Sequence, residues 1–241
     1  MSAEPDQKVV GVPWSTYIRW VADVWKPGEH WALVGPTGEG KTTHAVGILE
    51  LRRYIMALDP KGGDDTLSRM KLRRVPTWPL PRDIERDIAE GRPARLVVGP
   101  VVHTSSDRAV LRETCRRALE DAFDRGGFTV YIDEFQLAAD RRLMGLHLES
   151  EQLLIAARSK GVSVVTSYQA PAWVPTSASR QATWVTIWPT RDTDVIKKLG
   201  QIMGRPWREL EAAIGELPRF HTLTVGRNPR APLVMTTAPE L

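Results

Sequence analysis

The stretch HWALVGPTGEGKTT, residues 30–43, constrains this chain more than any other part of its sequence. It fits the phosphate-loop pattern G-x-x-x-x-G-K-[ST], with an apolar run before it that predicts a strand and a helical pattern after it. At this spacing, backbone N–H groups surround the α and β phosphates, Lys41 bridges the β and γ phosphates, and the Thr42 hydroxyl binds Mg²⁺. The sequence therefore predicts a nucleotide triphosphate site made by Gly35, Pro36, Thr37, Gly38, Glu39, Gly40, Lys41, Thr42 and Thr43.

A second acidic element, FTVYIDEF at residues 128–135, has the pattern of a buried strand that runs directly into two carboxylates. A strand of this kind beside a phosphate loop places its last residues at the phosphates, so Asp133 is predicted to hold Mg²⁺ through water. Glu134 is predicted to polarise the attacking water. A solvated turn is the alternative, but the phosphate loop elsewhere in the chain favours the catalytic interpretation, and two adjacent carboxylates indicate hydrolysis.

Length and composition indicate one globular domain. The 241 residues are 42% hydrophobic, which suits a single core, and we expect one P-loop domain at 29–241 preceded by an amphipathic helical extension at 1–28. The net charge of +4 is a mild basic excess that suits a phosphate-rich partner. The single cysteine, Cys115, excludes an internal disulfide, and no run reaches the ~20 apolar residues of a membrane span. We therefore expect a cytoplasmic protein, in the host cytoplasm if it is viral.

Strand and helix patterns alternate through most of the chain, which predicts an α/β fold with a largely parallel sheet, helices on both faces and the nucleotide at the carboxyl edge. Residues 66–94 receive no role, and all nine tryptophans are interpreted as core residues rather than as stacking partners for bases. Strands are predicted at 31–34, 54–58, 96–102, 128–135, 162–167 and 183–188, with a terminal hairpin-like pair at 220–225 and 232–236. Helices are predicted at 14–25, 43–52, 82–90, 107–125, 148–160, 192–203 and 207–214.

Four segments, in this order, resemble the FtsK/HerA superfamily of multimeric DNA-pumping ATPases, which includes viral genome-packaging ATPases. They are HWALVGPTGEGKTT, ALDPKGG, VYIDEF and AARSKGVSVVTSYQAP. The first and third occur in many phosphate-loop proteins, whereas the second and fourth discriminate this superfamily. The resemblance spans about residues 30–171 and implies a RecA-like P-loop NTPase fold that binds ATP and Mg²⁺.

The resemblance also implies roles for individual residues. Lys41, Thr42, Asp133 and Glu134 keep the roles given above, Gln169 becomes the γ-phosphate sensor, and Arg158 becomes an arginine finger that reaches a neighbouring subunit. The residues alone leave alternatives open, because Gln169 could cap a turn and Arg158 could be a solvated cation at the end of a helix. Tyr168 departs from the family, which has a small residue or threonine beside the sensor.

DNA contacts are expected where such motors carry loops that project into a central channel. The segment LAADRRLMGLH follows Asp133 and Glu134 at this place, so Arg141 and Arg142 are the candidates, with Lys61 a further one. Contacts of this kind go to phosphates and are sequence-independent. The alternative for Arg141 and Arg142 is a pair of solvated arginines.

These expectations combine into an ATP-driven translocase of double-stranded DNA that works as a homo-oligomeric ring, with genome packaging as the preferred role and a portal, capsid or membrane protein as a docking partner. A plasmid or conjugative transfer motor is one alternative. An ATP-dependent assembly or partition switch that moves no DNA is another, and Glu134 discriminates against it because a switch would tolerate its loss.

Overall fold

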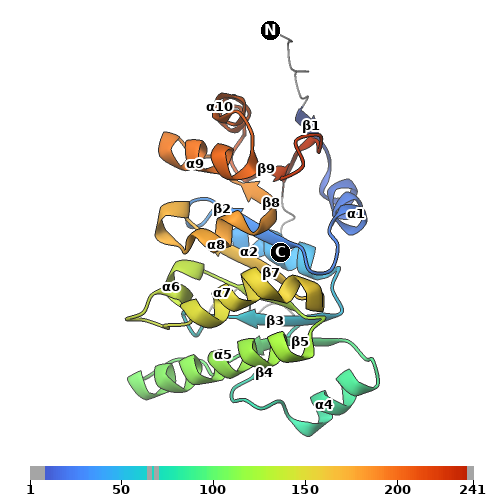
Figure 1. Ribbon diagram of the computed structural model, residues 1–241, viewed down its shortest axis with the longest axis vertical. Coiled ribbons are helices and arrows are strands. Elements are labelled where there is room, and N and C mark those ends of the chain that lie inside the picture. Colours follow the sequence, from blue (N-terminus) through green and yellow to red (C-terminus); the bar gives the residue numbers. More distant parts are fainter. Residues whose placement is uncertain (1–8, 64–66, 68–70, 238–241) are drawn as a thin grey trace.

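The computed structural model describes residues 9–63, 67 and 71–237. Within these residues ten strands form one sheet: β1 Val9–Gly11, β2 His30–Val34, β3 Tyr54–Leu58, β4 Arg73–Val75, β5 Ala94–Val98, β6 Thr129–Ile132, β7 Ser163–Tyr168, β8 Ala182–Ile187, β9 His221–Gly226 and β10 Leu233–Thr237. Their order in the sheet is β1-β10-β9-β8-β2-β7-β6-β3-β5-β4 (Figure 1). Only β9 runs antiparallel to its neighbours among these strands. The predicted largely parallel sheet is confirmed.

Helices cover both faces of the sheet (Figure 1). One face carries α1 Trp14–Val24 and α2 Lys41–Leu49, and the other carries α4 Arg82–Ala89, α5 Ser105–Arg125, α6 Phe135–Ala139, α7 His147–Ala156, α8 Thr176–Arg180, α9 Thr193–Met203 and α10 Trp207–Gly215. Two 3-10 turns, η1 Ala157–Lys160 and η2 Pro171–Trp173, follow α7 and β7. In the described part of the chain, no helix combines the length and the apolar character needed to cross a membrane.

The central strand β2 shows why the two faces form separate cores. Trp31 and Leu33 point to the core under α1 and α2, and Ala32 and Val34 point to the core under the remaining helices. A parallel strand covered on both sides is apolar along its whole length, because successive side chains alternate between two buried faces. This double burial fixes β2 and thereby the loop that leaves its carboxyl end.

Several sequence expectations are corrected by the structure. The predicted strand at 128–135 ends at Ile132, and a turn and α6 follow instead. The predicted helix at 148–160 is α-helical only to Ala156 and tightens into η1 before Gly161. The strands β1 and β4 were not predicted, because each has three residues and depends on pairing with a distant strand.

Most of the tryptophans follow the core interpretation. Trp31 and Trp188 are fully buried, and Trp25 stacks edge-on against Trp31 in the core beneath α1. Trp173 in η2 is 61% exposed, so its interpretation as a core residue is wrong. The ring belongs to a short turn, η2, whose first residue Pro171 is buried while Trp173 is exposed.

Candidate active site

The phosphate loop, residues 35–42, connects the end of β2 to the start of α2. Gly38 and Gly40 adopt φ angles of 82° and 89°, which side-chain-bearing residues rarely adopt, and Gly40 is the N-cap of α2. The loop borders a pocket of about 310 Å³ lined by Thr37, Gly38, Gly40, Lys41, Thr42, Thr43, Lys61, Asp133 and Glu134. Backbone N–H groups at the start of α2 and the helix dipole favour an anion here.

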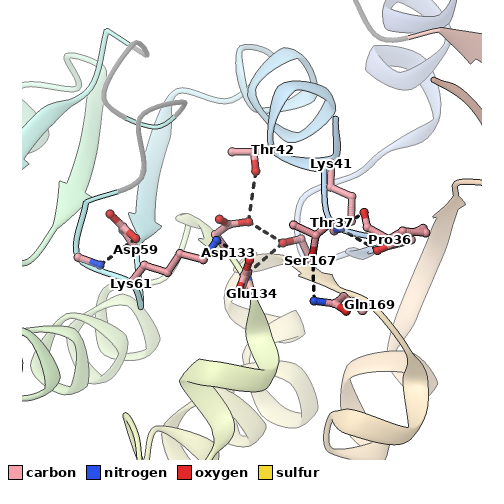
Figure 2. A network of polar contacts seen from close by, with 12 residues as sticks. Pro36, Thr37, Lys41, Thr42, Asp59, Lys61, Asp133, Glu134, Ser167 and Gln169 are labelled. Atoms are coloured by element: carbon pink, nitrogen blue, oxygen red, sulfur yellow. Dashed lines mark hydrogen bonds and ion pairs between the residues drawn. The ribbon is translucent and has the colours of Figure 1, made fainter. Parts of the chain in front are cut away.

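Lys41 lies inside this pocket with only 8% of its surface exposed. Its Nζ donates hydrogen bonds to the carbonyl oxygens of Gly35, at 2.8 Å, and Pro36, at 2.7 Å (Figure 2). Burial lowers the pKa of Lys41, and the nearby charges of Asp133 and Glu134 oppose that shift. The ammonium is thus held over the loop, where phosphate oxygens replace the solvent that it has lost.

Asp133 is the centre of a buried hydrogen-bond network at the end of β6. Its Oδ1 accepts hydrogen bonds from the hydroxyls of Tyr131, at 2.6 Å, and Ser167, at 2.7 Å, and lies 3.5 Å from the hydroxyl of Thr42 (Figure 2). Burial and the charge of Asp133 raise the pKa of Tyr131 well above its usual value, so the phenol remains a donor. Tyr131 and Ser167 therefore fix the orientation of the carboxylate.

The oxygens of Thr42 and Asp133 fit a Mg²⁺ ion. Mg²⁺ prefers hard oxygen ligands such as hydroxyls, carboxylates and water. The Thr42 hydroxyl and Asp133 Oδ1 lie 3.5 Å apart, so Thr42 would bind the metal and Asp133 would hold it through water. A hydroxyl and a carboxylate that face the same pocket are a suitable donor set, with water or phosphate oxygens completing the shell.

Glu134 adopts a left-handed backbone conformation, with φ 43° and ψ 60°. This conformation is uncommon for a residue other than glycine, and such strain concentrates at functional positions. The Glu134 N–H donates to Ser167 Oγ at 3.1 Å, which supports the turn. The carboxylate consequently faces the phosphate pocket, where its Oε1 lies 2.5 Å from Lys61 Nζ (Figure 2). Lys61 therefore lines the nucleotide pocket, although the sequence made it a candidate for contacting DNA.

Gln169 follows β7, whose neighbours are β2 and β6. Its Nε2 donates to Thr37 Oγ1 at 3.0 Å, so the amide lies against the phosphate loop (Figure 2). The adjacent Tyr168 points the other way, is fully buried and forms a 3.0 Å hydrogen bond with Ser179 Oγ. The family departure at Tyr168 thus changes the core beneath α8 and leaves Gln169 at the pocket.

The remaining predicted site residues lie away from this pocket. Arg158 is exposed in η1 at the amino edge of the sheet, where its carbonyl oxygen approaches Gly28 closely. The five residues of β2 separate that edge from Gly35 by roughly 16 Å at the usual rise per residue. Arg141 and Arg142 are exposed in the turn that follows α6.

Sequence reasoning missed two residues of the Asp133 network, Tyr131 and Ser167. The parallel register pairs Ile132 with Thr166, which places Ser167 beside Asp133. A serine at the tip of a predicted strand was the available signal. It becomes informative only when β6 and β7 are known to be neighbours.

No protein-family model and no curated protein matches this chain. Solved structures do match. The genome-packaging NTPase B204 of Sulfolobus turreted icosahedral virus 2, in complex with AMPPCP, superposes with a TM-score of 0.59 at 16% identity over 89% of this chain and 99% of its own. This chain shares the fold of B204.

Other solved structures share this fold. VirB4 of Thermoanaerobacter pseudethanolicus superposes with a TM-score of 0.60 at 10% identity, over 88% of this chain and 89% of its own. The conjugation coupling protein TcpA of pCW3 gives 0.50 at 14% identity, over 88% of this chain and 60% of its own. The predicted α/β fold of a P-loop ATPase is confirmed by these likenesses.

Proposed function

We propose that this chain is an ATPase that moves double-stranded DNA, with packaging of a genome into a capsid as its role. The observation that carries the proposal is the completeness of one site on the packaging-ATPase fold. Phosphate loop, metal-ligand oxygens and acidic base meet around one pocket, through Lys41, Thr42, Asp133 and Glu134. Gln169 is bonded to Thr37, which lines the same pocket. B204, whose fold is shared over nearly its whole length, is a genome-packaging NTPase.

The chemistry follows from the positions of these groups. The backbone N–H groups of the loop bind the α and β phosphates, and Lys41 bridges the β and γ phosphates. Thr42 would hold the metal directly and Asp133 through water. When bound, Mg²⁺ neutralises charge that develops on the phosphate oxygens. Glu134 takes a proton from the attacking water, and Gln169, whose amide is bonded to Thr37 of the phosphate loop, donates to the γ-phosphate.

The proposed motor is a homo-oligomeric ring. Arg158 lies at the far edge of the sheet from its own pocket, so it serves as an arginine finger only in the site of an adjacent copy. Arg141 and Arg142, exposed in the turn after α6, are proposed to contact the phosphates of the duplex. The ring is proposed to dock on a portal, capsid or membrane protein.

A second candidate function is DNA transfer in conjugation. The fold shared with the coupling protein TcpA favours it, although this chain covers only 60% of TcpA. Both functions need the same site and the same substrate, and they differ in the partner on which the ring docks.

The test is ATP hydrolysis with and without duplex DNA of unrelated sequences. We expect turnover to rise with any duplex, and we expect the DNA concentration for half-maximal stimulation to increase steeply with salt, because phosphate contacts release counterions. The measurement is phosphate release at several salt concentrations. Turnover that ignores DNA under all of them contradicts the motor and favours the assembly switch.

A further inference from the structure

The groups expected at the γ-phosphate all come from one side of β2. Asp133 and Glu134 follow β6, and Gln169 follows β7, while β8 and β9 lie on the other side of β2 in the sheet order. In a nucleoside triphosphate the base is at the opposite end of the molecule from the γ-phosphate. We therefore expect the base to lie beyond the phosphate loop, on the side of β8 and β9.

The segment that enters β9 lies at the carboxyl edge on this side. β9 runs antiparallel to β8, so its first residues lie beside the last residues of β8. Leu223 of β9 pairs with Ile187, which pairs with Val34 at the end of β2, and two strand spacings of about 4.8 Å separate β9 from β2. Phe220, just before β9, is therefore at the edge from which the phosphate loop leaves the sheet.

An ion pair joins this segment to the phosphate loop. Arg219 Nε lies 4.0 Å from Oε1 of Glu39, which is in the middle of the loop. The Arg219 side chain is 76% exposed, so the pair adds little to stability. Its significance is positional, because it places Arg219 beside the loop and Phe220 next to it in the chain.

The turn before β9 carries phenylalanine where glycine is usual. The His221 N–H donates to the Pro218 carbonyl at 3.1 Å, so Arg219 and Phe220 are the central residues of a four-residue turn. Phe220 has φ 63°, and a turn with positive φ at its third position normally carries glycine or asparagine there. Within the described residues, the only other non-glycine residue with positive φ is Glu134, the proposed base. Backbone strain of this kind concentrates at ligand sites.

The side chain of Phe220 does not offset this strain through burial. The residue is 45% exposed, although Arg219 Cζ lies 4.6 Å from its ring centroid. A planar aromatic ring and a planar guanidinium group both stack on nucleobases. Phe220 and Arg219 therefore present two kinds of surface that a base binds, next to the loop that binds the phosphates.

We propose that Phe220 stacks on the nucleobase of the bound nucleotide, with Arg219 as a second planar contact. The phosphate loop holds the phosphates, and the turn before β9 holds the other end of the same molecule. Stacking uses the face of the base rather than its hydrogen-bonding edge, so this contact adds affinity without selecting one base. The inference rests on the proposed ATPase function, and it assigns the part of the nucleotide site that the γ-phosphate groups leave open.

The test compares the binding of ATP with that of inorganic tripolyphosphate, which can occupy the phosphate loop but has no base. Isothermal titration calorimetry with Mg²⁺ present measures both dissociation constants for the unaltered chain, Phe220→Ala and Phe220→Tyr. We expect Phe220→Ala to raise the Kd of ATP about tenfold and to leave the Kd of tripolyphosphate unchanged. We expect Phe220→Tyr, which keeps an aromatic face, to bind both ligands as the unaltered chain does.

Trp173→Ala is the matched control, because Trp173 is also an exposed aromatic residue but follows β7, on the γ-phosphate side of β2. It should change neither Kd. An ATP Kd that Phe220→Ala leaves unchanged overturns the stacking. An equal weakening of ATP and tripolyphosphate also overturns it, because Phe220 would then support the shape of the loop. An unaltered chain that binds neither ligand contradicts the proposed function instead.

Discussion

The two edges of the central sheet differ in how firmly their candidate functional side chains are held. At the carboxyl edge, Asp133 is bonded by Tyr131 and Ser167, and Glu134 and Gln169 have defined partners around the phosphate loop. At the amino edge, Arg158 projects from a short 3-10 turn and is exposed. One edge holds groups that are positioned before any substrate arrives. The other offers an exposed cation that forms no ion pair with the described residues of its own subunit.

This difference indicates how a ring could be controlled. Groups fixed by buried hydrogen bonds cost little reorganisation during the reaction, which is what a catalytic site requires. A cation on the surface is positioned only when another surface meets it. If Arg158 completes a neighbouring site, then hydrolysis depends on contact between subunits, and the comparison between the edges becomes testable.

The largest effect is expected from mixing two inactive variants. Arg158→Ala should lower turnover about a thousandfold, since an arginine finger stabilises transition-state charge. Glu134→Gln should lower it by a similar factor while retaining ATP binding. A mixture should recover part of the activity, because an Arg158→Ala subunit still supplies Glu134 to a site completed by its neighbour. The measurement is phosphate release against the mixing ratio.

Lys160→Ala is the control for this experiment, because Lys160 lies in the same 3-10 turn and packs over the Phe123 ring at 4.0 Å. It should leave turnover unchanged. Mixtures that recover no activity at any ratio would show that Arg158 does not act across subunits. The exposure of Arg158 at the amino edge would then say nothing about how hydrolysis is controlled.

A smaller effect is expected at the carboxyl edge from two adjacent residues that point in opposite directions. Gln169→Ala should lower turnover roughly tenfold to a hundredfold, because it removes one positioned donor to the γ-phosphate. Tyr168→Phe should leave turnover unchanged and lower the free energy of unfolding by about 1 kcal/mol, because it removes the hydrogen bond to Ser179. Steady-state kinetics measure the turnover of both variants, and urea unfolding measures their stability. Equal losses of turnover in Gln169→Ala and Tyr168→Phe would refute the assignment of Gln169 as the γ-phosphate sensor.

A last effect, on stability rather than turnover, concerns the amino edge. His30 begins β2, its Nδ1 accepts from the Val164 N–H at 3.0 Å, and its Nε2 is bonded to the Leu154 carbonyl at 3.1 Å. Burial lowers the pKa of His30 from 6.5 to about 4. Between these values the unfolded chain binds the proton and the folded chain does not, so stability falls as the pH drops through this window.

His30 alone should cost roughly 2 kcal/mol of unfolding free energy between pH 7 and pH 4.5. His30→Gln should be less stable at pH 7 but should lose less on acidification, whereas His103→Gln, at an exposed position, should follow the unaltered chain. The measurement is urea unfolding at several pH values. Parallel curves for His30→Gln and the unaltered chain would exclude His30 as a source of the acid sensitivity.

The sequence predicted those parts of the molecule whose signal is local. The phosphate loop and the two carboxylates occupy a strand-to-helix turn and a strand end, and their spacing alone indicates the chemistry. The alternation of buried strands with amphipathic helices likewise predicted the parallel sheet. These features depend on neighbouring residues in the chain, which a single sequence displays.

Other features depend on which strands lie side by side, and these could not be predicted. Ser167 reaches Asp133 only because β7 pairs with β6. Lys61 faces Glu134 because β3 also pairs with β6, so the loop after β3 opens into the phosphate pocket. The basic character of Lys61 suggested DNA, while its place in the sheet gives it a carboxylate partner.

Both flanks of the sheet end in strands of three residues, β1 beside β10 and β4 beside β5. Unpaired strand flanks readily recruit strands from other molecules, and shortness or charge prevents this. Here β4 contributes Arg73 and Arg74, and β1 occupies the outer hydrogen-bonding groups of β10. Growth of the sheet from one copy of the chain into the next is therefore disfavoured. In the proposed ring, the subunits would join through helix surfaces and connecting loops, which can slide or tilt against one another.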